Sequence, residues 1–98
     1  MRRKALTAST FYVLLSLSTA DRDARGILED VAMSSAGRLR ITMSILTTRL
    51  RRLIAGGAVR AYRDGYRLTR EGRRQLADEL ERMERAVRFA RTRGAHKA

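Results

Sequence analysis

The chain has 98 residues, of which 44% are hydrophobic and 33% charged, and its formal net charge is +12. This length suits one small domain, and the charge indicates a polyanionic partner, first nucleic acid and second an anionic membrane surface. The absence of cysteine excludes disulfides and thiolate metal sites, and no apolar run approaches membrane-spanning length. The alternative is an arginine-rich surface that only solvates the protein.

The first helix is expected from about residue 8 to residue 18, with Thr7 as its N-cap. Its apolar face carries Phe11, Leu14, Leu15 and Leu17. The segment also resembles a secretory signal peptide, because Arg2-Arg3-Lys4 precede the apolar run. Hydroxyl residues interrupt that run, however, and the remaining chain needs a core helix. We therefore expect a core helix in a cytoplasmic protein.

A turn is expected from Thr19 to Arg22, with Asp21 or Asp23 capping a second helix over about residues 24–35. The inward side chains of this second helix are expected to be Ile27, Leu28, Val31 and Ala32. Gly37 should end the helix, and residues 38–41 should form a short extended link.

A third helix is predicted from near Thr42 to about Ala55, ended by Gly56-Gly57. Its apolar residues predict a core stripe of Ile45, Leu46, Leu50, Leu53 and Ile54. The other side carries Ser44, Thr47, Thr48, Arg51 and Arg52. Such a face can enter a DNA major groove, with hydroxyls near base edges and guanidinium groups near phosphates. An ordinary solvated helix face is equally compatible with this pattern.

A β-hairpin is predicted next, with strands over residues 59–63 and 66–69 around a type I′ turn at Asp64-Gly65. This turn pairs Arg63 with Tyr66, Tyr62 with Arg67, and Ala61 with Leu68. Ala61 and Leu68 would then face the core. The other face would be basic and aromatic, with Tyr62 and Arg67 stacked by a cation–π contact and Arg60 as a further cation.

The last helix is predicted from Thr69, its N-cap, through about Arg93, before Gly94. Acid-first (i, i+4) pairs are expected to stabilise it: Asp78 with Arg82, Glu81 with Arg85, and Glu84 with Arg88. Steps of four and three residues mark an apolar heptad seam of Leu76, Leu80, Met83, Val87 and Ala90. A core this small cannot cover so long a helix, so the seam predicts a homodimer interface. Packing within one chain is the alternative.

This order of elements is that of the winged helix-turn-helix, a mostly α fold with a small β-hairpin. Four motifs follow it in sequence: Leu6-Thr7 with Phe11 and Leu14-Leu15, Gly37-Arg38-Leu39-Arg40, Leu46 and Leu50-Arg51-Arg52-Leu53 with Gly57, and Tyr66-Arg67-Leu68-Thr69 followed by Gly72. Together they resemble the PadR-like transcriptional regulators in their short form, which has a single C-terminal helix. The expected division is a DNA-binding part over residues 1–69 and a dimerisation helix with a polar tail over residues 70–98, packed as one compact unit.

The chain departs from the family pattern in three places. Arg25-Gly26-Ile27 stands where the family usually has His-Gly-Tyr, and the stretch from Thr42 to Thr47 replaces Gly-Pro-Gly-Thr-Leu-Tyr. The wing is also shorter, with a tight turn in place of a loop. Some family members bind planar aromatic effectors, but this chain has no tryptophan to support such a pocket.

The resemblance implies a homodimeric DNA-binding regulator, usually a repressor, on a palindromic operator. The DNA contacts expected on this chain are Arg40, Thr42, Ser44, Thr47, Thr48, Arg51, Arg52, Arg63 and Arg67. A nucleic-acid binder without sequence preference, and a protein-interaction module that has lost DNA contact, are the alternatives. No cofactor or metal is expected, and no enzyme activity, because no phosphate-cradling loop or nucleophile–base pair is present.

Overall fold

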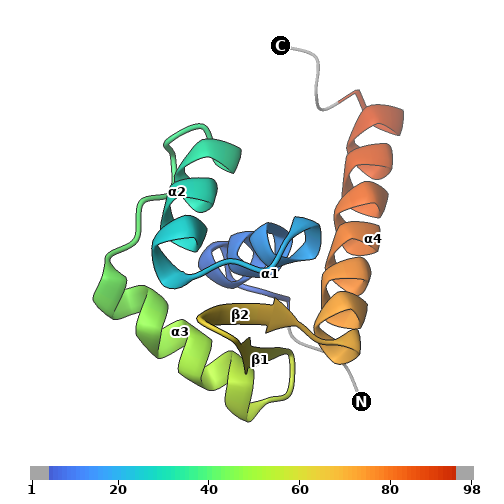
Figure 1. Cartoon of the computed structure of the whole chain (residues 1–98). Helices are drawn as coiled ribbons and strands as arrows, with labels where there is room; N and C mark the ends of the chain where they lie inside the picture. Colours follow the sequence, from blue (N-terminus) through green and yellow to red (C-terminus); the bar gives the residue numbers. More distant parts are fainter. Residues whose placement is uncertain (1–4, 95–98) are drawn as a thin grey trace.

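The computed structural model describes residues 5–94 and contains four helices and one hairpin (Figure 1). The elements are α1 (Ala8–Thr19), α2 (Ala24–Ser34), α3 (Met43–Ala55), β1 (Val59–Tyr62), β2 (Gly65–Leu68) and α4 (Arg70–Thr92). The predicted winged helix-turn-helix order is thus confirmed. The Arg2-Arg3-Lys4 run of the signal-peptide alternative lies outside the described residues. Among the helices of residues 5–94, none combines the length and apolar character that crossing a bilayer requires.

Each helix begins at a polar residue whose side-chain oxygen accepts a hydrogen bond from a backbone N–H three positions later. The four capping residues are Thr7, Asp23, Thr42 and Thr69. Of the two aspartates expected to compete for the start of α2, Asp23 caps it, with a 2.8 Å bond from the Gly26 N–H. Asp21 is therefore left for another partner.

The core surrounds α1, which lies between α2, the hairpin and α4 (Figure 1). Its buried apolar residues are Phe11, Val13, Leu14, Leu17, Ile27, Val31, Leu46, Leu50, Ala58, Val59, Leu68 and Leu76. The prediction that Ile45 and Ile54 belong to this core is wrong, because they are 44% and 39% exposed. Successive helical residues are about 100° apart, so Ile45 is turned well away from the buried Leu46.

The hairpin pairs Val59 with Leu68 and Tyr62 with Gly65, so the predicted register is wrong by two positions. The turn is at Arg63-Asp64, and Arg63 has the positive φ of +55°. Because side chains alternate between faces, a shift of two keeps each residue on its predicted face. Tyr62 and Arg67 still share a face, as diagonal neighbours. Of the two residues predicted to face the core, Leu68 is buried and Ala61 is exposed.

Another stretch of backbone closely approaches Gly65, the first residue of β2. Tyr66 and Arg22 exchange two backbone hydrogen bonds, of 2.9 and 3.3 Å, so the α1–α2 link forms a bridge beside β2. A Cβ at residue 65 would lie 2.6 Å from the Arg22 carbonyl oxygen. The glycine that predicted the turn is thus required for this approach, which is a tertiary contact.

The first half of α4 packs on α1 and buries Gly72, Leu76 and Glu79. Glu79 accepts a 3.3 Å hydrogen bond from the Leu6 N–H and pairs with Arg82. The Arg82 guanidinium and this N–H hold the pKa of Glu79 below its ordinary value, against the opposing effect of burial. Glu79, an acid with no role predicted from the sequence, thus ties the segment before α1 to α4.

Of the three predicted acid-first pairs on α4, the one between Glu81 and Arg85 is confirmed at 3.4 Å. Arg82 forms its ion pair with Glu79, three residues before it. No pair between Glu84 and Arg88 is present in the described part of the chain.

Candidate nucleic-acid interface

The side of α3 opposite Leu46 and Leu50 is open to solvent along its whole length. The five residues predicted for it, which are Ser44, Thr47, Thr48, Arg51 and Arg52, are all exposed. Figure 1 shows α3 at the edge of the molecule, followed directly by the hairpin. A convex helix with small polar residues near its start and arginines near its end fits the width of a DNA major groove. Arg40 is also exposed, in the link before α3.

The hydroxyls of this face already make hydrogen bonds within the protein. Thr42 caps α3 by accepting from the Ile45 N–H at 3.1 Å. Thr47 and Thr48 donate to the carbonyl oxygens of Met43 and Ser44, at 2.8 and 3.1 Å. The two threonines therefore keep acceptor lone pairs and a methyl group for an external partner, while their donor protons go to the helix backbone.

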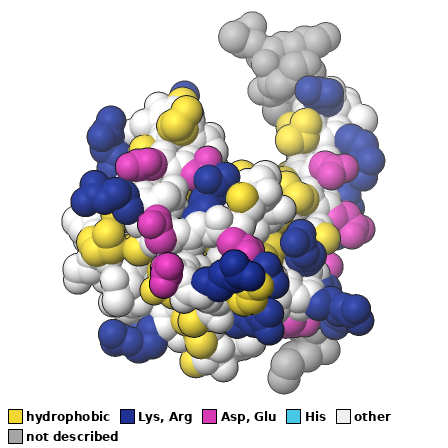
Figure 2. All heavy atoms as spheres, in the orientation of Figure 1, with side chains coloured by type: hydrophobic (Ala, Val, Ile, Leu, Met, Phe, Trp, Pro, Cys, Tyr) yellow, Lys and Arg dark blue, Asp and Glu magenta, His cyan; other side chains and the backbone are white. Residues whose placement is uncertain are grey.

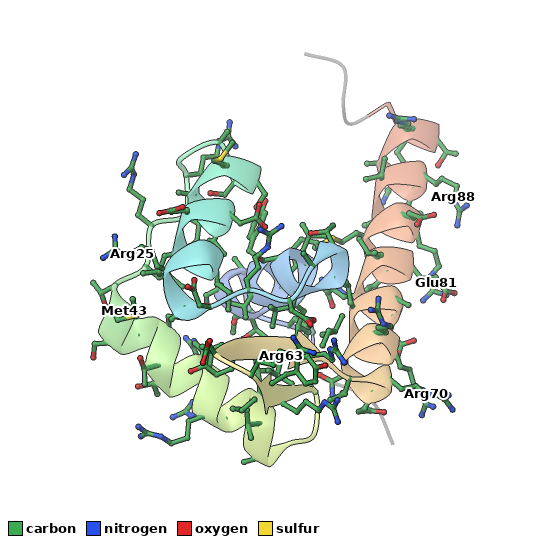
Figure 3. The ribbon with its side chains drawn as sticks, viewed as in Figure 1. Arg25, Met43, Arg63, Arg70, Glu81 and Arg88 are labelled. Carbon is green, nitrogen blue, oxygen red and sulfur yellow. The ribbon has the colours of Figure 1, made fainter. Side chains whose placement is uncertain are left out.

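Two exposed apolar residues, Met43 and Ile45, lie at the start of α3, and Figure 3 shows Met43 at the free end of the helix. Each is 44% exposed. Neither was predicted as a site residue. Ile45 was assigned to the core, and Met43 was given no role. A helical wheel centred on Leu46 and Leu50 would have placed Ile45 on the flank instead.

On the hairpin, three arginines surround the ring of Tyr62. The guanidinium carbon of Arg67 lies 3.6 Å from the ring centroid, and those of Arg63 and Arg60 lie 5.3 and 5.4 Å away. The predicted stacking of Tyr62 and Arg67 is confirmed. Figure 3 shows Arg63 over the hairpin, and Figure 2 shows arginines gathered at the centre of this view with acidic side chains beside them.

Asp21 holds Arg67 in a two-pronged ion pair. The Nε of Arg67 donates to Oδ1 of Asp21 at 3.2 Å and to Oδ2 at 3.1 Å. The Nη2 of Arg67 donates to Oδ2 at 2.7 Å. The Arg67 guanidinium lowers the pKa of Asp21, and Arg60 and Arg63 add to that effect. Arg67, predicted as a phosphate contact, is thus already engaged by a carboxylate in the free protein.

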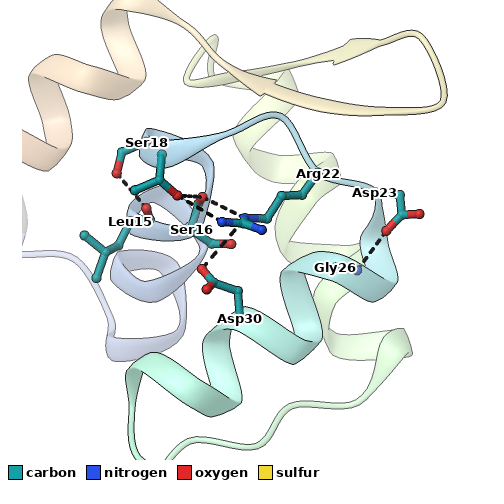
Figure 4. A network of polar contacts seen from close by, with 8 residues as sticks. Leu15, Ser16, Ser18, Arg22, Asp23, Gly26 and Asp30 are labelled. Atoms are coloured by element: carbon teal, nitrogen blue, oxygen red, sulfur yellow. Dashed lines mark hydrogen bonds and ion pairs between the residues drawn. The ribbon is translucent and has the colours of Figure 1, made fainter.

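Arg22, the residue after Asp21, is held by contacts to two helices (Figure 4). The Arg22 side chain donates to the Ser16 carbonyl oxygen at 3.1 Å and to the Thr19 hydroxyl at 3.0 Å, and it pairs with Asp30 at 3.8 Å. Its backbone also exchanges two hydrogen bonds with the backbone of Tyr66 in β2. Arg22 therefore joins α1, α2 and the hairpin at the point from which Asp21 reaches Arg67.

The predicted dimer seam on α4 has two different halves. Leu76 is part of the chain's own core and only 6% exposed. Beyond it, Leu80 and Val87 are 36% and 49% exposed, and Ala90 is half-buried. Met83, between them, is also half-buried and packs against the chain's own core. A shallow groove of about 320 Å³ runs along Leu80, Met83 and Val87. Figure 1 shows α4 along one side of the molecule, with its C-terminal end at about the height of the end of α2.

No protein-family model matches the sequence, and no curated protein matches it significantly. The resemblance to PadR-like regulators therefore stays a prediction.

Solved structures resemble the chain throughout its length. A transcriptional regulator from Clostridium thermocellum superimposes with a TM-score of 0.72 and 21% identity, over 87% of each chain. ZitR from Lactococcus lactis superimposes with a TM-score of 0.68 and 15% identity, over the whole of this chain and 65% of ZitR. The protein hsRosR-S1, solved as a complex structure, superimposes with a TM-score of 0.68 and 23% identity, over 92% of this chain and 93% of its own. At these identities the likeness shows the fold, which is one that a transcriptional regulator uses.

Proposed function

We propose that this chain is a sequence-specific DNA-binding transcriptional regulator, acting as a homodimeric repressor on a palindromic operator. The observation that carries the proposal is the outer face of α3, which is exposed, small and polar at its start, and basic at its end. A net charge of +12 supports a polyanionic partner. The likeness in fold to a transcriptional regulator supports the same function.

In the proposed complex, α3 lies in the major groove and the hairpin lies beside it along the phosphate backbone. Thr42, Ser44, Thr47 and Thr48 are nearest the base edges. Arg40, Arg51, Arg52 and Arg63 neutralise phosphates. Arg67 is proposed as the weakest of the predicted phosphate contacts, because a phosphate must first displace the Asp21 carboxylate.

The test is the salt dependence of binding by an Arg51→Ala variant. Removing one phosphate contact should weaken binding to every duplex sequence and reduce the slope of log affinity against log salt by about one. Fluorescence anisotropy on a labelled duplex, measured between low and physiological salt, gives both quantities.

The control is Arg74→Ala, which removes one exposed arginine from α4 instead. It should leave the slope near that of the unchanged protein. Equal slopes for the unchanged protein and Arg51→Ala would exclude α3 as the contact element.

A second candidate is a nucleic-acid binder without sequence preference, which the high charge and the two-residue hairpin turn favour. Duplexes selected from a random library separate the two functions. A regulator prefers a selected duplex over random competitor by a large factor, roughly a thousandfold or more. A ratio near one supports the non-specific binder, and no salt-dependent binding at all supports a protein-interaction module.

A further inference from the structure

We infer that the first two turns of α3 read the methyl groups of thymine in the major groove. This inference rests on the proposed function and names the sequence feature that the same site recognises. Two exposed apolar side chains at the beginning of α3, Met43 and Ile45, have no role in the proposed DNA contacts.

The exposed side of α3 carries two rows of side chains, one along each flank of the helix. Helical residues three or four positions apart lie next to each other on the surface, so Met43, Thr47 and Arg51 form one row. Ile45, Thr48 and Arg52 form the other. Each row begins with an exposed apolar residue, continues with a threonine and ends with an exposed arginine.

The apolar starts of these rows do not belong to the core. In the link just before α3, Leu39 and Ile41 pack against the core. Met43 and Ile45 are outside the packed cluster, and each leaves 44% of its surface in water. The exposed part of each side chain gains hydrophobic stabilisation only from a partner that covers it.

The threonines in the middle of the rows add methyl groups to the same surface. Both hydroxyls are turned back to the helix backbone, at 2.8 Å for Thr47 and 3.1 Å for Thr48. With the hydroxyl proton held there, each side chain has its methyl group and its oxygen lone pairs left to present outward. Met43 with Thr47, and Ile45 with Thr48, thus form a small apolar patch on each flank at the start of a helix whose end is basic.

A DNA major groove contains one apolar group, the C5-methyl of thymine. Side chains such as the threonine methyl discriminate thymine by apolar contact with it. The arginines at the ends of both rows would hold the helix in the groove while its start faces these methyls. The partner of this surface is therefore a duplex with thymines in each half-site.

The test compares two random duplex libraries of identical design, one made with thymine and one with uracil, which lacks only that methyl. The thymine library should yield enriched duplexes with thymine at defined positions. Replacing each such thymine singly with deoxyuridine should then weaken binding by about fourfold per contacted methyl.

Two variants assign the effect to residues. In Ile45→Ala the ratio of affinities for thymine and uracil duplexes should fall toward one at the position that Ile45 covers. The matched control is Ile54→Ala, which truncates an isoleucine 39% exposed at the far end of the same helix. In this control the ratio of affinities for thymine and uracil duplexes should stay at about four.

The outcomes distinguish failure of the thymine-methyl inference from failure of the proposed regulator function. Enrichment with no sensitivity to uracil at any position overturns this inference and leaves the proposed function standing. Unchanged sensitivity in both Ile45→Ala and Met43→Ala also overturns it. A protein that enriches neither library and shows no salt-dependent binding overturns the inference together with the proposed function.

Discussion

At the scale of single residues, the acid at the centre of the basic hairpin surface determines which arginines are free. Asp21 takes three hydrogen bonds from Arg67, and Arg67 in turn covers the ring of Tyr62. Because the Arg67 guanidinium lowers the Asp21 pKa, the carboxylate is charged at neutral pH and the pair persists there. The same pair limits how much positive charge the hairpin offers to DNA.

Asp21→Asn should therefore increase affinity for duplex DNA of random sequence. The substitution removes a negative charge and releases Arg67 for a phosphate, so affinity should rise on the order of fivefold and the salt slope should steepen by about one. Anisotropy titrations against salt measure both changes.

The comparison for this prediction is Asp64→Asn, which removes the same charge from the exposed hairpin turn without touching Arg67. If both variants gain equally, local charge alone explains the effect and the release of Arg67 does not.

At the scale of elements, the hairpin shows how one contact changes a local structure. Asp64-Gly65 is a strong turn signal, but the close approach of the Arg22 backbone requires a residue without a side chain at position 65. The turn therefore moves to Arg63-Asp64, and Arg63 adopts the positive φ. A side chain at position 65 would clash with the Arg22 backbone, and avoiding this clash outweighs the cost of placing Arg63 in the left-handed region.

Gly65→Ala should destabilise the protein for this reason. The new methyl would meet the Arg22 carbonyl oxygen at 2.6 Å, so the free energy of unfolding should fall by about 2–3 kcal/mol. Urea denaturation followed by circular dichroism measures it.

Gly56→Ala is the paired control at the end of α3, where a methyl would find its nearest neighbour at 3.4 Å and φ is negative. It should change the free energy of unfolding by less than about 0.5 kcal/mol. A Gly65→Ala variant as stable as this control would mean that the bridge can move away.

At the scale of the whole molecule, α3 and α4 lie on opposite sides of α1 (Figure 1). Leu76 of α4 completes the core, while Leu80 and Val87 further along the helix are exposed to solvent. A second copy paired along this part of α4 would leave α3 uncovered on the far side of each chain. This arrangement suits the proposed dimer, in which each α3 contacts one half-site.

Changing Leu80 and Val87 together to Glu should give a monomer. Each charge in a closed apolar seam should cost roughly 2–4 kcal/mol, which a small interface cannot absorb. Light scattering after gel filtration gives the mass.

Phe89→Glu is the matched substitution, since Phe89 is an apolar residue 60% exposed and, by helical geometry, on the opposite side of α4 from the seam. This variant should stay dimeric. A double variant that keeps twice the chain mass, or an unchanged protein that is monomeric, would refute the seam as the interface.

The sequence by itself determined the order of the elements, their caps and the buried centre of each helix, because these depend on local chemistry and on periodicity. Thr7, Thr42 and Thr69 were predicted as caps or helix starts for that reason, and they cap helices in the structure. The polar and basic face of α3 followed from the same periodicity, although its two apolar neighbours, Met43 and Ile45, did not.

Only the tertiary structure decided the turn position, the pairing of Asp21 with Arg67, the burial of Glu79 and the division of the α4 seam at Leu76. Each depends on contacts between residues far apart in the chain, where the partner is set by how the elements pack and not by sequence spacing. Asp21 and Arg67 are 46 positions apart, and Leu6 and Glu79 are 73 apart. No helical or strand period relates such pairs, so their geometry appears only when α1, the hairpin and α4 are brought together.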